Sequence, residues 1–354
     1  MSSKVDLNEK FISFLEQTKG QEHKSIKRLN DRVLIVDGLN TFIRSFSVNP
    51  AINDDGLHIG GLIGFLKSLR YTCDILKPSR CIIVFDGKNG SSRRQKIYPE
   101  YKQNRKVKKR LNRNVDWGTA PQDEEQSMLQ QMGRVVEYLE QLPLTLVCVD
   151  GIEADDGMAY ISQQLLPESD IILMSTDKDF LQLVDDRVKV WSPTKKKLYN
   201  KKAVFDEFGV HSHNMLTYRI LDGDKSDNIG GIKGEGLKSL QKFCPKISSD
   251  EKFDVRDLLE FVENSDSKIK LLENIKKSGN IIKRNYLLMQ LNKVDIPNHI
   301  KMKIQGAVNG KVPQLIKYKF QTMFLKDKLT NAIPNLDSWI MEFVRLDRFR
   351  GLSK

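Results

Sequence analysis

The sequence predicts an α/β protein with a parallel sheet in its core and a helical C-terminal region. The clearest evidence is the segment of residues 144–183. It begins with an apolar run of strand length (residues 144–149), continues through a helical stretch that ends near Leu166, and reaches a second apolar run at residues 171–174. We expect the two strands to be parallel and joined by a right-handed crossover, because strand–helix–strand units are built that way.

Strand-like and helix-like segments alternate on both sides of this unit. Residues 32–36 and 81–85 have the composition of buried strands, and an Asp-Gly pair follows each of them. Residues 60–71 and about 121–142 have the apolar periodicity of helices. Residues 188–202 predict a last strand or a hairpin with a basic tip, and from about residue 204 the pattern is helical.

Length and composition indicate an ordinary globular protein. The chain has 354 residues, of which 39% are hydrophobic and 29% charged, with a formal net charge of +12. A basic balance suits a polyanionic substrate, although charge alone is weak evidence for one. We expect three parts: an N-terminal extension (1–30), an α/β core (31–205) and a helical C-terminal domain (206–354).

The amino-acid sequence shows neither a membrane-spanning segment nor a signal peptide. No apolar run reaches membrane-spanning length, and the first residues lack the apolar core of a signal peptide. The four cysteines show no paired spacing, so we expect buried thiols in a reduced compartment, and a cytoplasmic protein. They are Cys73, Cys81, Cys148 and Cys244.

Carboxylates follow the predicted strands, at the point where each strand ends. They are Asp37, Asp86, Glu153, Asp155, Asp156, Asp177 and Asp179. Because the carboxyl ends of parallel strands line one crevice, we expect these side chains to lie close together. A helix cap explains one acid per helix start, and Asp-Gly is an ordinary turn signal, but neither explains the repetition.

A carboxylate cluster of this kind requires cations. Two carboxylates about 4 Å apart repel by roughly 4 kcal/mol at an effective dielectric constant of about 20. Hard oxygen ligands without Cys or His nearby favour Mg²⁺ or Mn²⁺. The sequence therefore predicts a divalent-metal site, and the alternative that one of Asp155 and Asp156 only caps a helix stays open.

A strongly basic run follows the second predicted strand. Residues 93–113 carry ten basic residues against one acid, Glu100, with Tyr98 and Tyr101 interleaved. Such a run can hold phosphates while its tyrosines stack on bases. The alternative is a solvated helix face or loop. The position of the run, seven residues after Asp86, favours nucleic acid, because the run must lie over the rim of the same crevice.

A glycine-rich segment lies between two predicted helices, at about residues 222–240. Residues 230–236 resemble a hairpin whose free N–H groups can hold a backbone phosphate. The spacing is wrong for a dinucleotide fingerprint. Asp224 and Asp227, which precede the hairpin, could be ordinary caps.

A terminal helix is also predicted. Its apolar face should pack against its own domain, with docking of a replication partner as the alternative. That face comprises Leu336, Trp339, Ile340, Phe343 and Val344.

Six motifs, taken in order, resemble the 5′-nuclease family. They are VLIVDGLN, IIVFDG, RRQKIYPEYKQNRK, GIEADD, STDKDF and GDKSDNIGGIKGEG, within residues 31–240. That family includes flap endonucleases, the 5′-exonuclease domain of bacterial DNA polymerase I and phage 5′ exonucleases. Within it, the RNase H enzymes of T-even-type bacteriophages are the nearest likeness. The resemblance implies a PIN-like nuclease core with a helical arch at about 93–120 and a helix-hairpin-helix DNA-binding element at about 222–240.

The resemblance also implies roles for individual residues. One metal ion would be held by Asp37, Asp86, Glu153 and Asp155, with Asp156 assisting. A second would be held by Asp177, Asp179, Asp224 and Asp227. Lys102 and Arg105 would steady the scissile phosphate. Nucleic acid would be contacted by Arg93, Arg94, Lys96, Tyr101, Gly231, Lys233, Gly234, Gly236 and Lys238. The cofactors would be two Mg²⁺ ions, with Mn²⁺ as a substitute and K⁺ at the hairpin.

The implied function is that of a monomeric 5′→3′ exonuclease and flap endonuclease acting on DNA and RNA–DNA hybrids. It would remove RNA primers and 5′ flaps during phage DNA replication, together with a sliding clamp and a single-strand-binding protein. Two alternatives remain. A non-catalytic, structure-specific DNA-binding protein would be expected to lack some of the acids. An RNA-specific PIN-type endonuclease would be smaller and would not account for the glycine hairpin.

Overall fold

The computed structural model describes residues 26–106, 110–117, 121–232, 237–265 and 269–352. A six-stranded sheet forms its centre. The first five strands are parallel, and the sixth is antiparallel to the fifth. In spatial order the strands are β3 (Thr145–Val149), β2 (Arg80–Asp86), β1 (Arg32–Asp37), β4 (Asp170–Met174), β5 (Val188–Ser192) and β6 (Lys197–Tyr199).

The predicted strands and the final hairpin are confirmed, and the structure adds their order. β3 and β4 are parallel, as expected, but β2 and β1 lie between them. A strand–helix–strand pattern does not specify how many strands the crossover passes. As a consequence, β1, β2 and β4 are neighbours and their carboxyl ends meet at one edge of the sheet.

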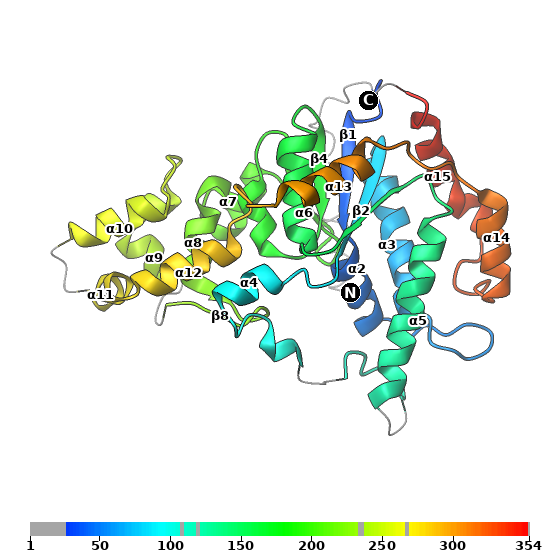
Figure 1. Ribbon diagram of the computed structural model, residues 1–354, viewed down its shortest axis with the longest axis horizontal. Helices are drawn as coiled ribbons and strands as arrows, with labels where there is room; N and C mark the ends of the chain where they lie inside the picture. Colours follow the sequence, from blue (N-terminus) through cyan, green and yellow to red (C-terminus); the bar gives the residue numbers. More distant parts are fainter. Residues whose placement is uncertain (1–25, 107–109, 118–120, 233–236, 266–268, 353–354) are drawn as a thin grey trace, which may run out of the picture.

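Helices cover both faces of the sheet (Figure 1). Alternate residues of β1 point to opposite faces: Leu34 and Val36 enter one core, and Val33 and Ile35 the other. The first core includes residues of α2 (Gly38–Val48), α3 (Gly60–Leu76), α5 (Pro121–Leu139), α14 (Lys317–Lys326) and α15 (Leu336–Phe349). The second includes residues of α6 (Ala154–Tyr160), α7 (Lys201–Phe208) and α13 (Asn298–Asn309).

The C-terminal region divides into two parts, unlike the single helical domain predicted for residues 206–354. One part is a lobe with its own apolar core, at the left of Figure 1. It consists of α8 (Met215–Asp222), α9 (Leu237–Phe243), α10 (Val255–Glu263), α11 (Lys270–Lys277) and α12 (Gly279–Met289). The other part, α13 to α15, returns to the sheet, α13 on one face and α14 with α15 on the other.

The terminal helix packs against its own domain, as predicted from its apolar face. Trp339, Ile340 and Phe343 are buried, and the ring of Trp339 stacks on that of Phe320 from α14, with 5.3 Å between centroids. Phe320 also meets Tyr138 of α5 edge to face at 5.0 Å. This cluster ties the last helices to the sheet.

The cysteine prediction needs one correction. Cys73, Cys81 and Cys244 are buried, but Cys148 is exposed. It lies on the edge strand β3, on the face opposite Val147, which packs in the core that contains α13. Among the described helices, none combines the length and apolar character needed to cross a bilayer.

Phe320→Ala should lower the free energy of unfolding by about 3–5 kcal/mol, because it leaves a cavity between α14 and the core. Urea denaturation checks this, with Tyr318→Ala as the control. Tyr318 is on the same helix but is 77% exposed, so its loss should cost less than about 0.5 kcal/mol. Equal effects of the two changes would show that α14 is not part of the core.

Candidate metal centre and its surroundings

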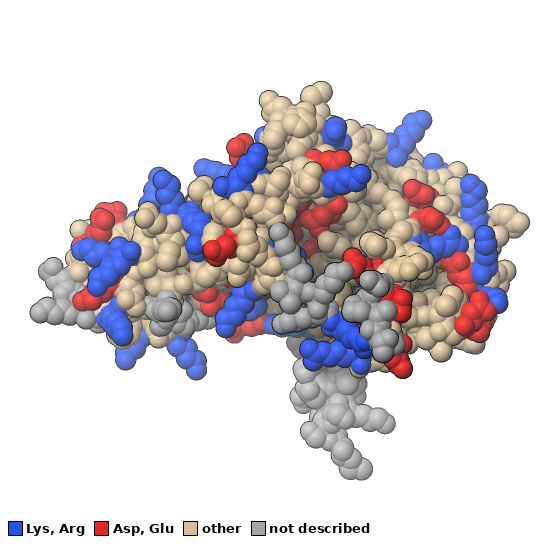
Figure 2. Space-filling view, turned by 60° about the horizontal axis from the view of Figure 1, so that its bottom comes forward, with Lys and Arg blue, Asp and Glu red and all other residues tan. Residues whose placement is uncertain are grey.

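A cavity of about 1010 Å³ opens where β1, β2 and β4 end. Five of the predicted carboxylates line it, and we call it the carboxylate pocket: Asp37, Asp86, Asp155, Asp177 and Asp227. In Figure 2, Asp and Glu side chains are visible in a recess near the middle of the view. Lys and Arg side chains are spread over the surrounding surface in the same view.

The two strand-end carboxylates are fixed by backbone and hydroxyl donors. Asp37 ends β1 and accepts hydrogen bonds from the backbone N–H of Asn40 at 3.0 Å and from the Ser175 hydroxyl at 3.1 Å. Asp86 ends β2 and accepts from the backbone N–H of Ala154 at 2.8 Å. This last bond joins the end of β2 to the start of α6, and so brings Asp155 toward the same pocket.

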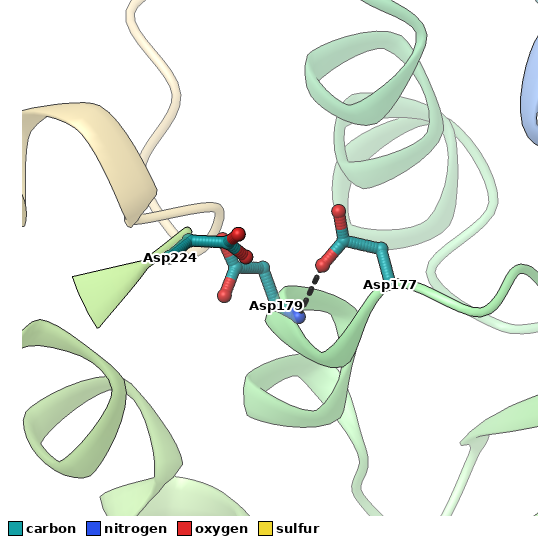
Figure 3. Close-up of side chains that lie close together, drawn as sticks. All are labelled: Asp177, Asp179 and Asp224. Carbon is teal, nitrogen blue, oxygen red and sulfur yellow. Dashed lines mark hydrogen bonds between the residues drawn. The ribbon is translucent and has the colours of Figure 1, made fainter. Parts of the chain in front are cut away.

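Asp155 and Asp177 complete the group. Asp155 lies in the first turn of α6. Asp177 precedes the short helix η3 (Lys178–Leu183) and accepts from the backbone N–H of Asp179 at 2.8 Å, the dashed line in Figure 3. Within the part of the chain that the structure describes, no Lys or Arg side chain forms an ion pair with these two groups or with Asp37 or Asp86. We call the four the unpaired carboxylates.

Burial and electrostatic repulsion raise the pKa values of three of these carboxylates, Asp37, Asp155 and Asp177. Burial raises the pKa of Asp37 to about 7, and the charges of Asp86 and Asp177 add to the rise. Burial raises the pKa of Asp155 well above its usual value, with repulsion from Asp177 and Asp37 as the next causes. The pKa of Asp177 is raised mainly by burial. A divalent cation among these oxygens would remove both penalties, and an all-oxygen donor set fits Mg²⁺ or Mn²⁺.

A second carboxylate group adjoins the first. Asp177, Asp179 and Asp224 can each bring one oxygen within 4.8 Å of the others (Figure 3). Asp179 and Asp224 are bridged by Arg219 of α8, whose Nε and Nη2 donate to them at 2.8 and 2.6 Å. Burial raises the pKa of Asp179 to about 7 and Asp177 adds to the rise, although Arg219 opposes it.

Arg219 was not predicted from the sequence. It lies within a helix and 40 residues from Asp179, and an arginine at that place gives no local signal of its role. Its side chain is only 5% exposed, and it also donates to the carbonyl of Gly223 at 3.1 Å. The second group therefore carries a fixed positive charge that the unpaired carboxylates lack.

Glu153 and Asp156 face a buried guanidinium. Arg94 donates to Glu153 at 2.5 Å and to both oxygens of Asp156 at 2.8 Å, and Arg93 reaches Asp156 at 3.0 Å. Burial alone would raise the pKa of Glu153, but Arg94 and Lys102 lower it below its usual range. Asp156 does not line the carboxylate pocket, so the structure gives it an ion-pairing role in place of the predicted assistance to a metal.

Two of the predicted nucleic-acid contacts are buried in this structure. Arg94 is 3% exposed and Tyr101 is 2% exposed, so neither can reach a substrate in this arrangement. The Tyr101 hydroxyl donates to Glu153 and to Asp227, both at 3.1 Å. In a segment that mixes basic residues with tyrosines, some side chains can pack inside the protein while others face solvent. The sequence does not show which ones are buried.

Lys102 and Arg105 line the pocket, as expected of residues that would meet a phosphate there. Lys102 has a left-handed backbone (φ 59°), and its N–H donates to the carbonyl of Asp227 at 2.9 Å. Its ammonium pairs with Glu153, while Arg105 pairs with the Asp227 carboxylate. Asn104 donates to the carbonyl of Lys225 at 2.8 Å. We call residues 100–105 and 225–228 together the arch–loop junction.

The remaining predicted contacts divide by exposure. Lys96 on α4 (Ser92–Ile97) and Lys238 on α9 are exposed, and Arg93 is partly exposed. Gly231 is required by packing: a Cβ there would lie 2.2 Å from the carbonyl oxygen of Asp222. Lys233, Gly234 and Gly236 lie outside the described residues, as do parts of the arch. The described arch contains α4 and one 3₁₀ turn, Gln103–Lys106.

Comparison with known proteins gives a consistent result. Residues 32–209 match the family described as "5'-3' exonuclease, N-terminal resolvase-like domain". The 5'-3' exonuclease of Aquifex aeolicus is 31% identical over 219 residues, which cover 61% of this chain and 70% of that protein. The 5'-3' exonuclease of Bacillus subtilis is 30% identical over 222 residues, covering 60% and 69%.

Solved structures show the same fold. The flap endonuclease of bacteriophage T5, in a pseudo-enzyme–product complex with DNA and metal ions, matches with a TM-score of 0.60 at 22% identity, over 84% of this chain and 99% of that one. A second structure, of the T5 5'-exonuclease with divalent zinc ions, also gives 0.60, at 21% identity and the same coverage. The predicted PIN-like nuclease fold is confirmed.

Without divalent cations, the free energy of unfolding should fall as the pH rises from about 5 to about 8. Folded Asp37 keeps its proton up to about pH 7, whereas an unfolded Asp loses it near pH 4. The folded state therefore binds more protons in this window, and that stabilising contribution is lost as the pH rises through 7. Mg²⁺ should replace the protons, and so raise the melting temperature more at about pH 8 than at about pH 6.

Calorimetry in chelator and in Mg²⁺ measures both effects. Asp37→Asn is the matched control and should weaken the pH dependence seen in chelator. A melting temperature in chelator that does not change across this pH range would contradict the proton-sharing described for the pocket.

Arg94→Met should lower the free energy of unfolding by about 3–5 kcal/mol, because it removes the buried cation that Glu153 and Asp156 share and leaves only Lys102 and Arg93 to pair with them. Lys96→Met, on the same helix but exposed, should change stability by less than about 0.5 kcal/mol. Urea denaturation and a DNA-binding titration distinguish the two roles. An Arg94→Met protein of normal stability but weakened DNA affinity would restore the reading of Arg94 as a substrate contact.

Proposed function

The chain belongs to the 5′-3′ exonuclease family and is an enzyme of that family, and we propose that it hydrolyses phosphodiester bonds as a metal-dependent 5′→3′ exonuclease and flap endonuclease. The observation that carries the proposal is the group of unpaired carboxylates at the edge of the sheet. A protein that needed so many buried acids only for folding would pair them with its own cations, as it does Glu153 and Asp156. Charge left uncompensated in a pocket of this size points to cationic cofactors.

We assign each metal-binding role by position. Asp37, Asp86 and Asp155, together with Asp177 from the predicted second group, would hold a first Mg²⁺, for which Mn²⁺ can substitute. Glu153, which the family resemblance assigned to this ion, is paired with Arg94 and Lys102 and would adjoin the site through those cations. Asp179 and Asp224, with Asp227 and the shared Asp177, would hold or orient waters around a second. Such a pair of ions makes hydroxide available near neutral pH and stabilises charge on the attacking and leaving oxygens. A K⁺ at the glycine hairpin remains a prediction from the family resemblance.

The basic side chains of the pocket would position the substrate. Lys102 and Arg105 are held at its entrance by Glu153 and Asp227. A phosphate entering the pocket would exchange with these carboxylates and receive charge-assisted hydrogen bonds that grow stronger as its oxygens gain charge. Glu153 would remain paired with Arg94 while the phosphate binds. It would therefore stay in place and keep Lys102 directed toward the pocket.

The substrate we propose is DNA with a 5′ flap or 5′ end, together with RNA–DNA hybrids. The net charge of +12 favours a polyanion. Arch residues such as Lys102 and Arg105 line the pocket, and Gly231 and the exposed Lys238 would contact the duplex. Removal of RNA primers and flaps during phage DNA replication, by a monomer in the host cytoplasm with a sliding clamp or single-strand-binding protein nearby, is the corresponding biological role.

The two alternatives predict different behaviour. A non-catalytic DNA-binding protein has no need of the unpaired carboxylates, and the structure brings all four into one cavity. An RNA-specific endonuclease would cut single-stranded RNA in preference to flapped DNA. Both can therefore be tested with the same set of substrates.

Cleavage of a 5′-labelled flapped duplex should require Mg²⁺ and should stop in chelator. Asp177→Asn removes one unpaired carboxylate with little change in shape, and should reduce the rate by at least about a hundredfold while duplex binding persists. Asp186→Asn, a change at an acid that is 91% exposed and does not line the pocket, is the matched control. Metal-independent cleavage, or normal cleavage by Asp177→Asn, would contradict the proposed function.

A further inference from the structure

Arg44 of α2 lines the carboxylate pocket, and no motif of the sequence singled it out. α2 begins directly after Asp37, and Leu39, Ile43 and Arg44 share the face that lines the pocket. At about 1.5 Å per residue, Arg44 lies roughly 10 Å along the helix axis from Asp37. Its backbone is therefore about two helical turns from Asp37, and its side chain lines the same cavity as the unpaired carboxylates.

The pocket lining outside the carboxylate group includes a set of apolar side chains, alongside charged ones such as Arg110 and Glu125. The apolar ones are Leu39, Ile43, Leu111 and Met128. The buried acid of this wall, Glu124, accepts the backbone N–H groups of Leu111 and Asn112 at 2.9 and 2.7 Å. Its carboxylate is thus already used to fix the end of the arch segment on α5.

The guanidinium of Arg44 has no partner of its own among the described residues. No described side chain or carbonyl forms an ion pair or hydrogen bond with it. Half-burial lowers the pKa of Arg44, and no acid is close enough to oppose that effect. Lys102 and Arg105, by contrast, are matched by Glu153 and Asp227.

A half-buried guanidinium without a counter-charge costs free energy that an incoming anion would recover. Arginine offers a planar, two-pronged donor that matches a phosphate. We propose that Arg44 binds a backbone phosphate of the single-stranded 5′ segment, away from the scissile bond. This assignment rests on the proposed function, since it takes the reacting phosphate to lie at the unpaired carboxylates.

The distance limits which phosphate this is. A stacked strand places one phosphate about every 3.4 Å along its axis. The offset of about 10 Å along α2 then corresponds to a phosphate about three nucleotides from the scissile bond for a stacked strand, and to a nearer phosphate for a more extended one. The strand would cross from the carboxylates toward Leu111 and Met128, beneath the arch segment. The apolar wall there suits the sugar and base faces of an unpaired strand.

The test is a thermodynamic cycle that combines a substitution at Arg44 with a change at one phosphate of the substrate. Binding of a flapped duplex is measured in Ca²⁺ for the wild type and for Arg44→Met. The substrates carry either normal phosphates or one neutral methylphosphonate at each of the first three positions 5′ of the scissile bond. Arg44→Met should weaken binding of the normal flap about tenfold, and should reduce the slope of log K against log salt by about 0.7.

The expected result is non-additivity at one position. At that position the methylphosphonate should weaken binding by the wild type about tenfold. It should leave the affinity of Arg44→Met unchanged, because that protein has already lost the contact. Arg44→Lys should recover part of the affinity. Lys67→Met, which removes an exposed charge from α3, is the matched control and should bind as the wild type does.

Two results would overturn the inference. In the first, Arg44→Met binds the normal flap as tightly as the wild type does. In the second, the methylphosphonate weakens binding equally for the wild type and for Arg44→Met at every one of the three positions. If Arg44→Met melts well below the wild type, Arg44→Gln takes its place under the same criteria. Failure of the proposed function is distinguishable, because it would appear as absent cleavage in Mg²⁺ while this binding cycle still reported on Arg44.

Discussion

The structure depends on electrostatic repulsion among carboxylates gathered at one edge of the sheet. β1 and β2 are neighbouring parallel strands whose last residues, Asp37 and Asp86, both line the pocket, and the bond from Ala154 to Asp86 brings α6 to the same place. The protein balances part of this charge with its own cations. Arg94 neutralises Glu153 and Asp156, and Arg219 bridges a second pair. What remains unbalanced faces the pocket, and protons or metal ions must balance it.

The same arrangement connects distant parts of the chain. Arg94 lies on the arch segment yet bonds to α6 and to the carbonyl of Leu288 in α12. Asn104 and Lys102 join the arch to the loop that contains Asp227. The arch, the sheet edge and the helical lobe therefore meet around the carboxylates, so a change in one alters the others. Substrate that displaces Lys102 or Arg105 from its carboxylate would loosen these connections locally, where the strand must pass.

The sequence predicted much of this arrangement, and the exceptions have physical causes. Strands and strand-end acids were readable because burial imposes a local apolar pattern and the chain turns just after it. Pairing was not readable: Arg94 and Tyr101 looked like substrate contacts, since local sequence does not show which side of a basic segment is buried. Arg219 and Arg44 carry no motif, and their roles come from contacts made, or missing, across the fold. The return of α13 to α15 to the sheet likewise depends on long-range packing.

The most direct test of the central claim is to locate Mn²⁺ by anomalous X-ray scattering in crystals grown with that ion. The account predicts a peak bounded by Asp37, Asp86, Asp155 and Asp177, with any second peak on the side of Asp179 and Asp224. Asp155→Asn crystals should lose or weaken the first peak. Mn²⁺ bound beside Glu153 and Asp156, or found only at exposed acids, would contradict the claim that the unpaired carboxylates form the metal centre.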